Sequence, residues 1–152
     1  MYELEAPIPL PKVELRSRLQ LEWTAQHVRH EARPVHSWNQ VRVLIGHVGT
    51  TEWPWLTVQS TQASRRRRRA ICAGFADILT VDVSDLDASG RARNVRRLGL
   101  GAPMDRWIDL GPSLGSCPPV RQFQVLPPPI VTIAFREWLE LGRTDTFSCE
   151  DV

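Results

Sequence analysis

Polar and apolar residues alternate along residues 13–24, and this alternation predicts a β-strand with one buried face. The odd positions hold the apolar residues Val13, Leu15, Leu19, Leu21 and Trp23, whereas the even positions from 18 to 24 are polar. A period of two places the apolar side chains on one face of a strand.

Four later segments also favour strands. Residues 53–59 are aromatic and β-branched, and Pro54 places the start of this strand at a sheet edge or a strand entry. Residues 78–83 put Leu79, Val81 and Val83 on one face. Residues 107–110 and 120–126 are shorter candidates. Residues 84–90 and 111–119 are predicted to be a turn and a loop, because they are rich in turn-forming residues.

Helical signals are weaker than the strand signals. Ser37 suits the N-cap of a short helix over residues 38–44, although residues 41–45 would serve equally as a strand. Residues 130–141 are predicted to begin as a strand and to continue as a helix that stops at Gly142. The prolines before this segment, Pro127, Pro128 and Pro129, are interpreted as a rigid spacer.

These segments predict a β-rich α+β fold: a single domain with a twisted, mostly antiparallel sheet or a small sandwich, and one or two short helices. The chain of 152 residues, 42% of them hydrophobic, is long enough for one core. We divide it into an extended proline-containing arm over residues 1–12, a β-rich domain over 13–143 and a loose acidic tail over 144–152. Such an arm often docks on a neighbouring subunit, and the alternative is a plain tail.

Five consecutive arginines interrupt this pattern before the apolar residues 70–75: Arg65, Arg66, Arg67, Arg68 and Arg69. Like charges in a row repel and cannot all be buried, so we expect the run in solvent or against a polyanion, at the mouth of a strand. Guanidinium groups match phosphate oxygens, which favours nucleic acid or acidic lipid as the partner. The alternative is a solvated loop, since Lys12 is the only lysine among 19 basic residues and arginine is used throughout.

A second basic cluster follows the predicted turn and consists of Arg91, Arg93, Arg96 and Arg97. Residues 1–76 hold eleven basic and six acidic side chains, whereas residues 77–152 hold eight and eleven. One end of the molecule is therefore expected to be electropositive. We predict that both arginine clusters contribute to a surface that binds nucleic acid or lipid.

The chain contains six tryptophans, and most are expected in the core because each buries a large area. Trp53 and Trp55 are expected on the same side of a strand near the arginine run. They are the pair that we consider for stacking on bases or for an interface, with core packing as the alternative.

The sequence contains no recognisable catalytic or metal-binding motif, so we predict no catalytic residues, no metal and no other cofactor. Residues 85–90 begin like a calcium loop, but its twelfth position is Arg96 instead of glutamate, which favours an ordinary turn. The four histidines lack nearby thiolates and the spacing of a helical ligand pair. Residues 98–101 lack the third glycine of a dinucleotide-binding loop.

Cys72, Cys117 and Cys149 are odd in number and widely spaced, which fits a reducing compartment better than a disulfide framework. The acidic start of the chain predicts no signal peptide, and no apolar run approaches the ~20 residues that span a bilayer. We expect a protein that is soluble or that binds membrane only at its surface.

One stretch carries a family resemblance: Arg33-Pro34-Val35-His36-Ser37-Trp38-Asn39-Gln40-Val41. Within residues 19–59 it resembles the central part of rhabdovirus matrix proteins, which have a strand, an Arg-Pro pair, a short helix and an aromatic-rich strand. The lysine-rich N-terminus and the proline-containing release motifs of that family are absent. The resemblance implies a β-rich, self-assembling protein between a nucleocapsid and the inner membrane leaflet, with the arginine run against acidic lipid or ribonucleoprotein.

We therefore expect a non-enzymatic viral structural protein, matrix-like or active in particle assembly, located in the virion and the host cytoplasm. It would form homo-oligomers and contact nucleic acid, ribonucleoprotein or acidic membrane through its arginines. The alternative is a small RNA- or DNA-binding accessory protein, such as an RNA-sequestering suppressor. An enzyme whose site forms from distant residues is a third hypothesis.

Overall fold

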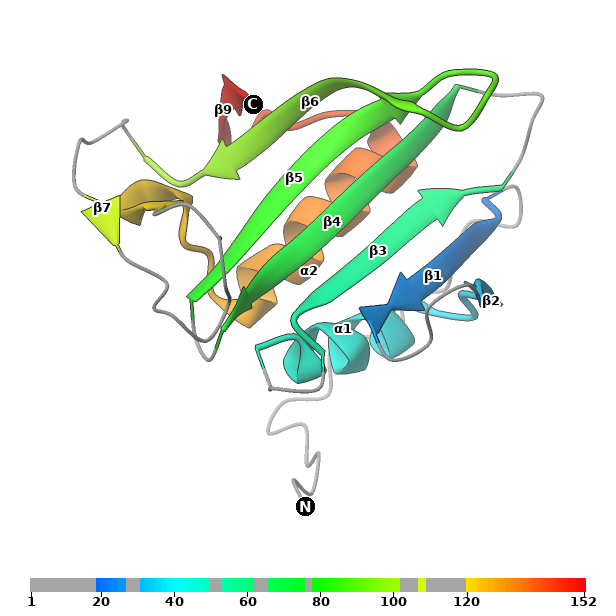
Figure 1. Cartoon of the computed structure of the whole chain (residues 1–152), viewed down its shortest axis with the longest axis horizontal. Helices are drawn as coiled ribbons and strands as arrows, with labels where there is room; N and C mark the ends of the chain where they lie inside the picture. Colours follow the sequence, from blue (N-terminus) through cyan, green and yellow to red (C-terminus); the bar gives the residue numbers. More distant parts are fainter. Residues whose placement is uncertain are drawn as a thin grey trace.

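The computed structural model describes residues 19–26, 31–49, 53–61, 66–75, 78–101, 107–108 and 120–152. The proline-containing arm, the first part of the predicted strand at residues 13–18 and Arg65 lie outside these ranges. Within them, the chain forms a seven-stranded antiparallel sheet with two helices packed against one face (Figure 1). The predicted β-rich α+β fold is confirmed.

The main sheet has the strand order β2-β1-β3-β4-β5-β6-β9, and every neighbouring pair is antiparallel. Its strands are β1 (Leu21–Ala25), β2 (Arg33–Pro34), β3 (Trp55–Ser60), β4 (Arg67–Phe75), β5 (Ile78–Leu86), β6 (Ala92–Gly99) and β9 (Ser148–Asp151). A separate pair joins β7 (Trp107–Ile108) to β8 (Val120–Arg121). The strands predicted near residues 21, 55 and 80 are therefore present.

The first helix, α1 (Trp38–His47), begins at the residue that the sequence suggests. Ser37 is its N-cap, and the Ser37 hydroxyl oxygen accepts a hydrogen bond of 3.1 Å from the Gln40 backbone N–H. This bond satisfies one of the backbone donors that a helix leaves unpaired at its start. The predicted helix is confirmed, and the alternative of a strand over residues 41–45 is wrong.

The second helix, α2 (Pro128–Arg136), continues as a π-helix (Glu137–Leu141) and stops at Gly142, which has a left-handed φ of 64°. Pro128 and Pro129 form the first turn of α2, where a missing N–H leaves no hydrogen bond unmade. The prolines are thus the start of the helix, so the predicted spacer and the predicted initial strand are wrong. The predicted strand over residues 120–126 is reduced to β8 and a 3₁₀ turn (Gln122–Gln124).

The core lies between the helices and one face of the sheet, which we call the helix face. Alternate residues of β1, β3, β4 and β5 point into it, and α1 and α2 add their own apolar residues. Its fully buried members include Leu56, Val58, Cys72, Val81, Val83, Val41 and Phe135. We call the opposite side of the sheet the outer face. The predicted alternation of Leu79, Val81 and Val83 is confirmed, since all three are buried.

Three segments pair more extensively than their local sequence suggests. β5 runs to Leu86, so the predicted turn at residues 84–90 starts three residues later. The second arginine cluster lies within β6, and the acidic stretch expected to be loose contributes β9, which pairs with β6 from Arg96↔Asp151 to Gly99↔Ser148. In each case the neighbouring strand extends the pairing beyond what the residues of the segment predict, because tertiary pairing overrides local preference.

Candidate functional site

The described arginines of both clusters gather at one end of the main sheet, apart from Arg97. At this end β3 stops, β4 starts and β5 turns into β6, at the upper right of Figure 1. Asp85 of β5 lies directly between the clusters, because it is the register partner of Arg68 on β4 and of Arg93 on β6. We call this region the basic end: Arg66, Arg67, Arg68, Arg69, Arg91, Arg93 and Arg96.

Three arginines of the run, Arg67, Arg68 and Arg69, are part of a central strand, whereas the sequence alone suggests that the run precedes the strand. β4 begins at Arg67, and Arg67, Arg68 and Arg69 are all half-buried. Side chains alternate across a strand, so Arg67 and Arg69 lie on the outer face while Arg68 lies on the helix face with Ala70 and Cys72. The strand tolerates consecutive like charges because its alternation separates neighbours onto opposite faces.

On the outer face, Arg69 joins three segments. Its Nε donates to Gln59 Oε1 at 3.1 Å, and its guanidinium donates to the Gly90 carbonyl oxygen at 3.2 Å. Gln59 in turn donates to Glu22 on β1. Burial, and then the charge of Arg67, lower the pKa of Arg69. These contacts tie β1, β3 and the β5–β6 hairpin together, so Arg69 has a structural role.

Arg66 forms the most regular ion pair of the basic end. Its Nε and Nη2 donate to the two carboxylate oxygens of Asp85, each at 2.8 Å. The Arg66 side chain is 69% exposed, whereas that of Asp85 is 13% exposed. The hydrogen bond from Arg66 to Asp85 raises the pKa of Arg66. Asp85 thus has both oxygens occupied by a single arginine.

Arg68 and Arg96 contact the indole ring of Trp138, in the π-helix. Their guanidinium carbons lie 5.8 and 5.2 Å from its centroid. The Trp138 Nε1–H donates to the carbonyl oxygens of Arg69, at 3.0 Å, and Ser84, at 3.3 Å. Burial, followed by the charge of Arg66, lowers the pKa of Arg68. The ring is therefore fixed against β4 and β5, with two arginines around it.

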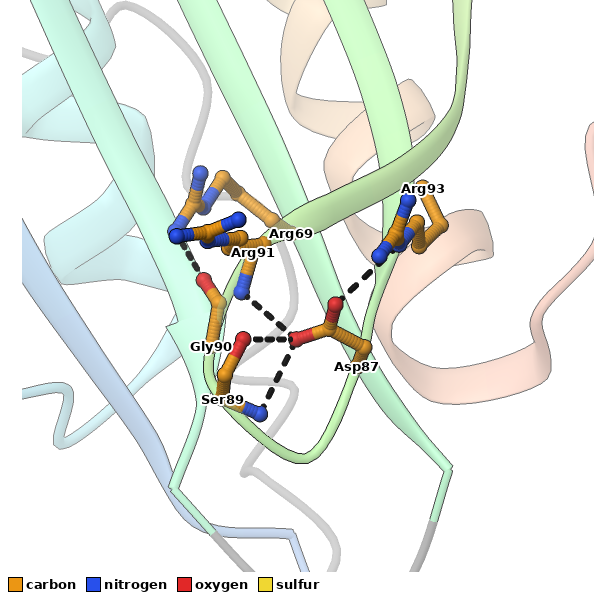
Figure 2. Close-up of polar contacts among 6 residues, drawn as sticks. All are labelled: Arg69, Asp87, Ser89, Gly90, Arg91 and Arg93. Carbon is orange, nitrogen blue, oxygen red and sulfur yellow. Dashed lines mark hydrogen bonds and ion pairs between the residues drawn. The ribbon is translucent and has the colours of Figure 1, made fainter.

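The β5–β6 hairpin completes the basic end and is organised by Asp87 (Figure 2). The Asp87 carboxylate accepts from the Ser89 N–H at 2.9 Å, the Ser89 hydroxyl at 2.6 Å, the Arg91 N–H at 2.9 Å and Arg93 Nε at 3.1 Å. The Ser89 hydroxyl is the main reason that the pKa of Asp87 falls to about 2. The carboxylate is occupied by four donors, which agrees with an ordinary turn and not with a calcium loop.

Arg97 does not belong to the basic end. It lies on the outer face of β6, where its Nε and Nη2 donate to Asp82 at 2.8 and 3.0 Å. Its register partner on β9 is Glu150, which accepts from Arg121 at 2.7 Å. The predicted binding residue Arg97 is thus part of an alternating row of acidic and basic side chains that lies across β5, β6, β9 and β8.

Trp53 and Trp55 lie far from the arginines. Trp55 is the register partner of Ala73, four residues along β3 from the Gln59↔Arg69 pair, or about 13 Å at the usual rise of a strand. Trp53 precedes β3 and stacks on Trp23 with a centroid distance of 6.3 Å. The expected proximity of this pair to the run is wrong, and for Trp53 core packing is the observed role.

Trp138 is the aromatic residue of the basic end, and the sequence does not indicate it. Sixty-nine positions separate it from Arg69, whose carbonyl oxygen it contacts. No local sequence pattern indicates a contact between residues so far apart in the chain. Only a prior assignment of α2 to the helix face, with Trp138 near its end, would have suggested it.

The rest of the described structure offers little other chemistry. Within the described ranges, no three histidine, cysteine or acidic side chains are grouped so as to hold a metal ion. None of the helices in the same ranges is both long and apolar enough to cross a membrane. Comparisons of the chain with protein-family models, curated proteins and solved structures found no match.

Proposed function

We propose that this protein is a non-enzymatic binding protein that contacts nucleic acid through the basic end. The observation that carries the proposal is the convergence of two arginine clusters, separated in sequence by the whole of β5, on one end of one sheet. Arg66, Arg91 and Arg93 are exposed there. Arg66 forms an ion pair with Asp85, and Arg93 forms one with Asp87.

Nucleic acid fits this arrangement better than a membrane surface does. Acidic lipid attracts flexible polybasic segments through charge alone, without a defined geometry. The basic end instead mounts its guanidinium forks on strands and on a tight hairpin, where their spacing is fixed. Alternate residues of one strand are about 7 Å apart, and planar forks match individual phosphate groups. A rigid row of forks suits a backbone of discrete phosphates.

The test is binding to labelled single-stranded RNA over a salt series. The test variant is R66Q/R91Q/R93Q, which removes exposed arginines whose ion pairs contribute little to stability. The control is R33Q/R42Q/R136Q, which removes the same charge from β2, α1 and α2. In the test variant, the slope of log K for RNA binding against log salt concentration should be about 2 less steep than in the wild type, because each lost phosphate contact removes about 0.7. In the control variant the slope should change less.

Two results would overturn the proposal. Equal losses in the test and control variants would mean that net charge, and not the basic end, drives binding. Binding to acidic liposomes but not to RNA, lost in the test variant, would make the basic end a membrane contact.

A matrix-like, self-assembling role is a second candidate. Its support is the edge of the main sheet: within the described residues β9 pairs on one side only, as do the first residues of β6, and unpaired strand edges recruit further strands. Light scattering over a concentration series tests it. Growth into large assemblies supports this role, and a discrete monomer at all concentrations excludes it.

A further inference from the structure

Arg68 and Arg96 carry side-chain hydrogen-bond donors that no described residue satisfies. A guanidinium has five N–H donors. Within the part of the chain that the structure describes, neither side chain makes a hydrogen bond or an ion pair, and both contact the Trp138 ring. The Nε of Arg96 is also buried from solvent, and no described residue supplies an acceptor for it. A buried donor of this kind normally has a partner, which can be a bound ion.

The aspartates paired in register with Arg68 and Arg96 do not bond to either guanidinium. Asp85, the register partner of Arg68, has both oxygens held by Arg66. Asp151, the register partner of Arg96 on β9, forms no ion pair with it in the described structure. The positive charge beside Trp138 therefore lacks a bonded counter-charge among the described residues.

We propose that Arg68 and Arg96 form an oxyanion site beside the indole of Trp138 and that the group it takes is a phosphate. The inference rests on the proposed function for the source of that phosphate, a nucleic-acid backbone. It goes beyond that function because it assigns a specific phosphate-binding site to two residues of the charged surface. Arg66, Arg91 and Arg93 contribute only charge around this site.

Phosphate fits the site better than a carboxylate does. The two oxygens of a carboxylate lie in one plane, and Arg66 engages both oxygens of Asp85 with a single fork. A phosphate presents its oxygens in several directions, so it can accept from forks that approach from β4 and from β6. The Arg68 and Arg96 side chains come from these two different strands.

The site is also rigid before any ligand arrives. Trp138 is held by its two hydrogen bonds to carbonyl oxygens of β4 and β5, and the residue is 3% exposed. Because both guanidinium groups contact this fixed ring, little conformational entropy remains to be lost when an anion binds.

The first experiment titrates the wild-type protein with inorganic phosphate at constant ionic strength, with chloride replaced step by step. ¹H–¹⁵N spectra of the arginine Nε–H groups report each side chain separately. The signals of Arg68 and Arg96 should shift with saturation, while those of Arg91 and Arg143, which are exposed, should not. Shifts that are absent, or that are linear and equal in all four arginines, would overturn the site.

The second experiment compares RNA binding by R68Q/R96Q with that by R91Q/R93Q, which removes the same charge from the same end. A lost charge-assisted hydrogen bond predicts an affinity about tenfold or more below that of R91Q/R93Q. R68K/R96K, which keeps the charge but not the fork, should also bind weakly. Thermal unfolding of each variant verifies that it is folded.

The outcomes separate this inference from the proposed function. Equal losses in R68Q/R96Q and R91Q/R93Q, or full binding by R68K/R96K, overturn the phosphate site and leave the basic end as a diffuse contact for nucleic acid. Saturable binding of inorganic phosphate by a protein that binds no RNA keeps the site, with free phosphate as its ligand, and overturns the proposed function.

Discussion

Replacing Trp138 with phenylalanine should destabilise the protein by about 3 kcal/mol. The Nε1–H hydrogen bond to the Arg69 and Ser84 carbonyl oxygens is lost, at about 1 kcal/mol. A smaller ring also weakens the contacts with Arg68 and Arg96, by about 1 kcal/mol together. The buried volume left empty adds roughly 1 kcal/mol.

Urea unfolding followed by far-ultraviolet circular dichroism measures this difference, and the melting temperature should fall by about 6–12 °C for a chain of this length. Trp107→Phe is the matched control, because Trp107 is 56% exposed and its replacement should change stability by less than about 0.5 kcal/mol. If the two variants are equally stable, Trp138 does not hold the π-helix against β4 and β5.

Three further predictions concern single positions. Gly142→Ala should destabilise by about 1–2 kcal/mol in urea unfolding, because its φ is 64° and an added Cβ would collide with the Arg68 guanidinium. Gly46→Ala, with nothing within 4 Å of the added Cβ, should be neutral or stabilising. Asp87→Asn should destabilise at pH 6, and its difference from wild type should shrink as pH falls from about 4 towards 2. The pKa of Asp87 is lowered to about 2 in the folded protein, so its contribution is present above the unfolded value of 3.8 and lost through the folded one; a constant difference would contradict this. Cys149, which is exposed, should react with a thiol reagent in the native protein, whereas burial raises the pKa of the Cys72 thiol and should protect it until unfolding, as peptide mapping by mass spectrometry would report.

The local sequence was sufficient to predict secondary structure where the neighbours of a residue along the chain determine its environment. The alternation of Leu21 and Trp23, or of Leu79, Val81 and Val83, identifies strands with one buried face, and both stretches are strands. Ser37 marks a helix start because the group that it caps is three residues away. These signals need no knowledge of the rest of the fold.

Elsewhere the deciding partner is remote in sequence. Arg68 lies in a central strand, opposite Asp85 and beside the ring of Trp138, and neither residue is near it in the chain. The tail forms β9 because the edge of β6 is available to it. The three prolines read equally as a spacer or as the first turn of a helix, and only the docking of α2 on the sheet decides. Composition alone therefore could not distinguish solvated arginines from arginines mounted on strands.

The position of α2 in the chain also has a consequence for synthesis on the ribosome. Strands β3 to β6 follow one another through successive hairpins and can pair as soon as they emerge, but the helix that covers β4 and β5 is encoded only from Pro128 onwards. Until it emerges, the apolar side chains of Leu79, Val81 and Val83 have no cover on that face. Apolar surface that is exposed during this interval favours chaperone binding and aggregation between neighbouring ribosomes.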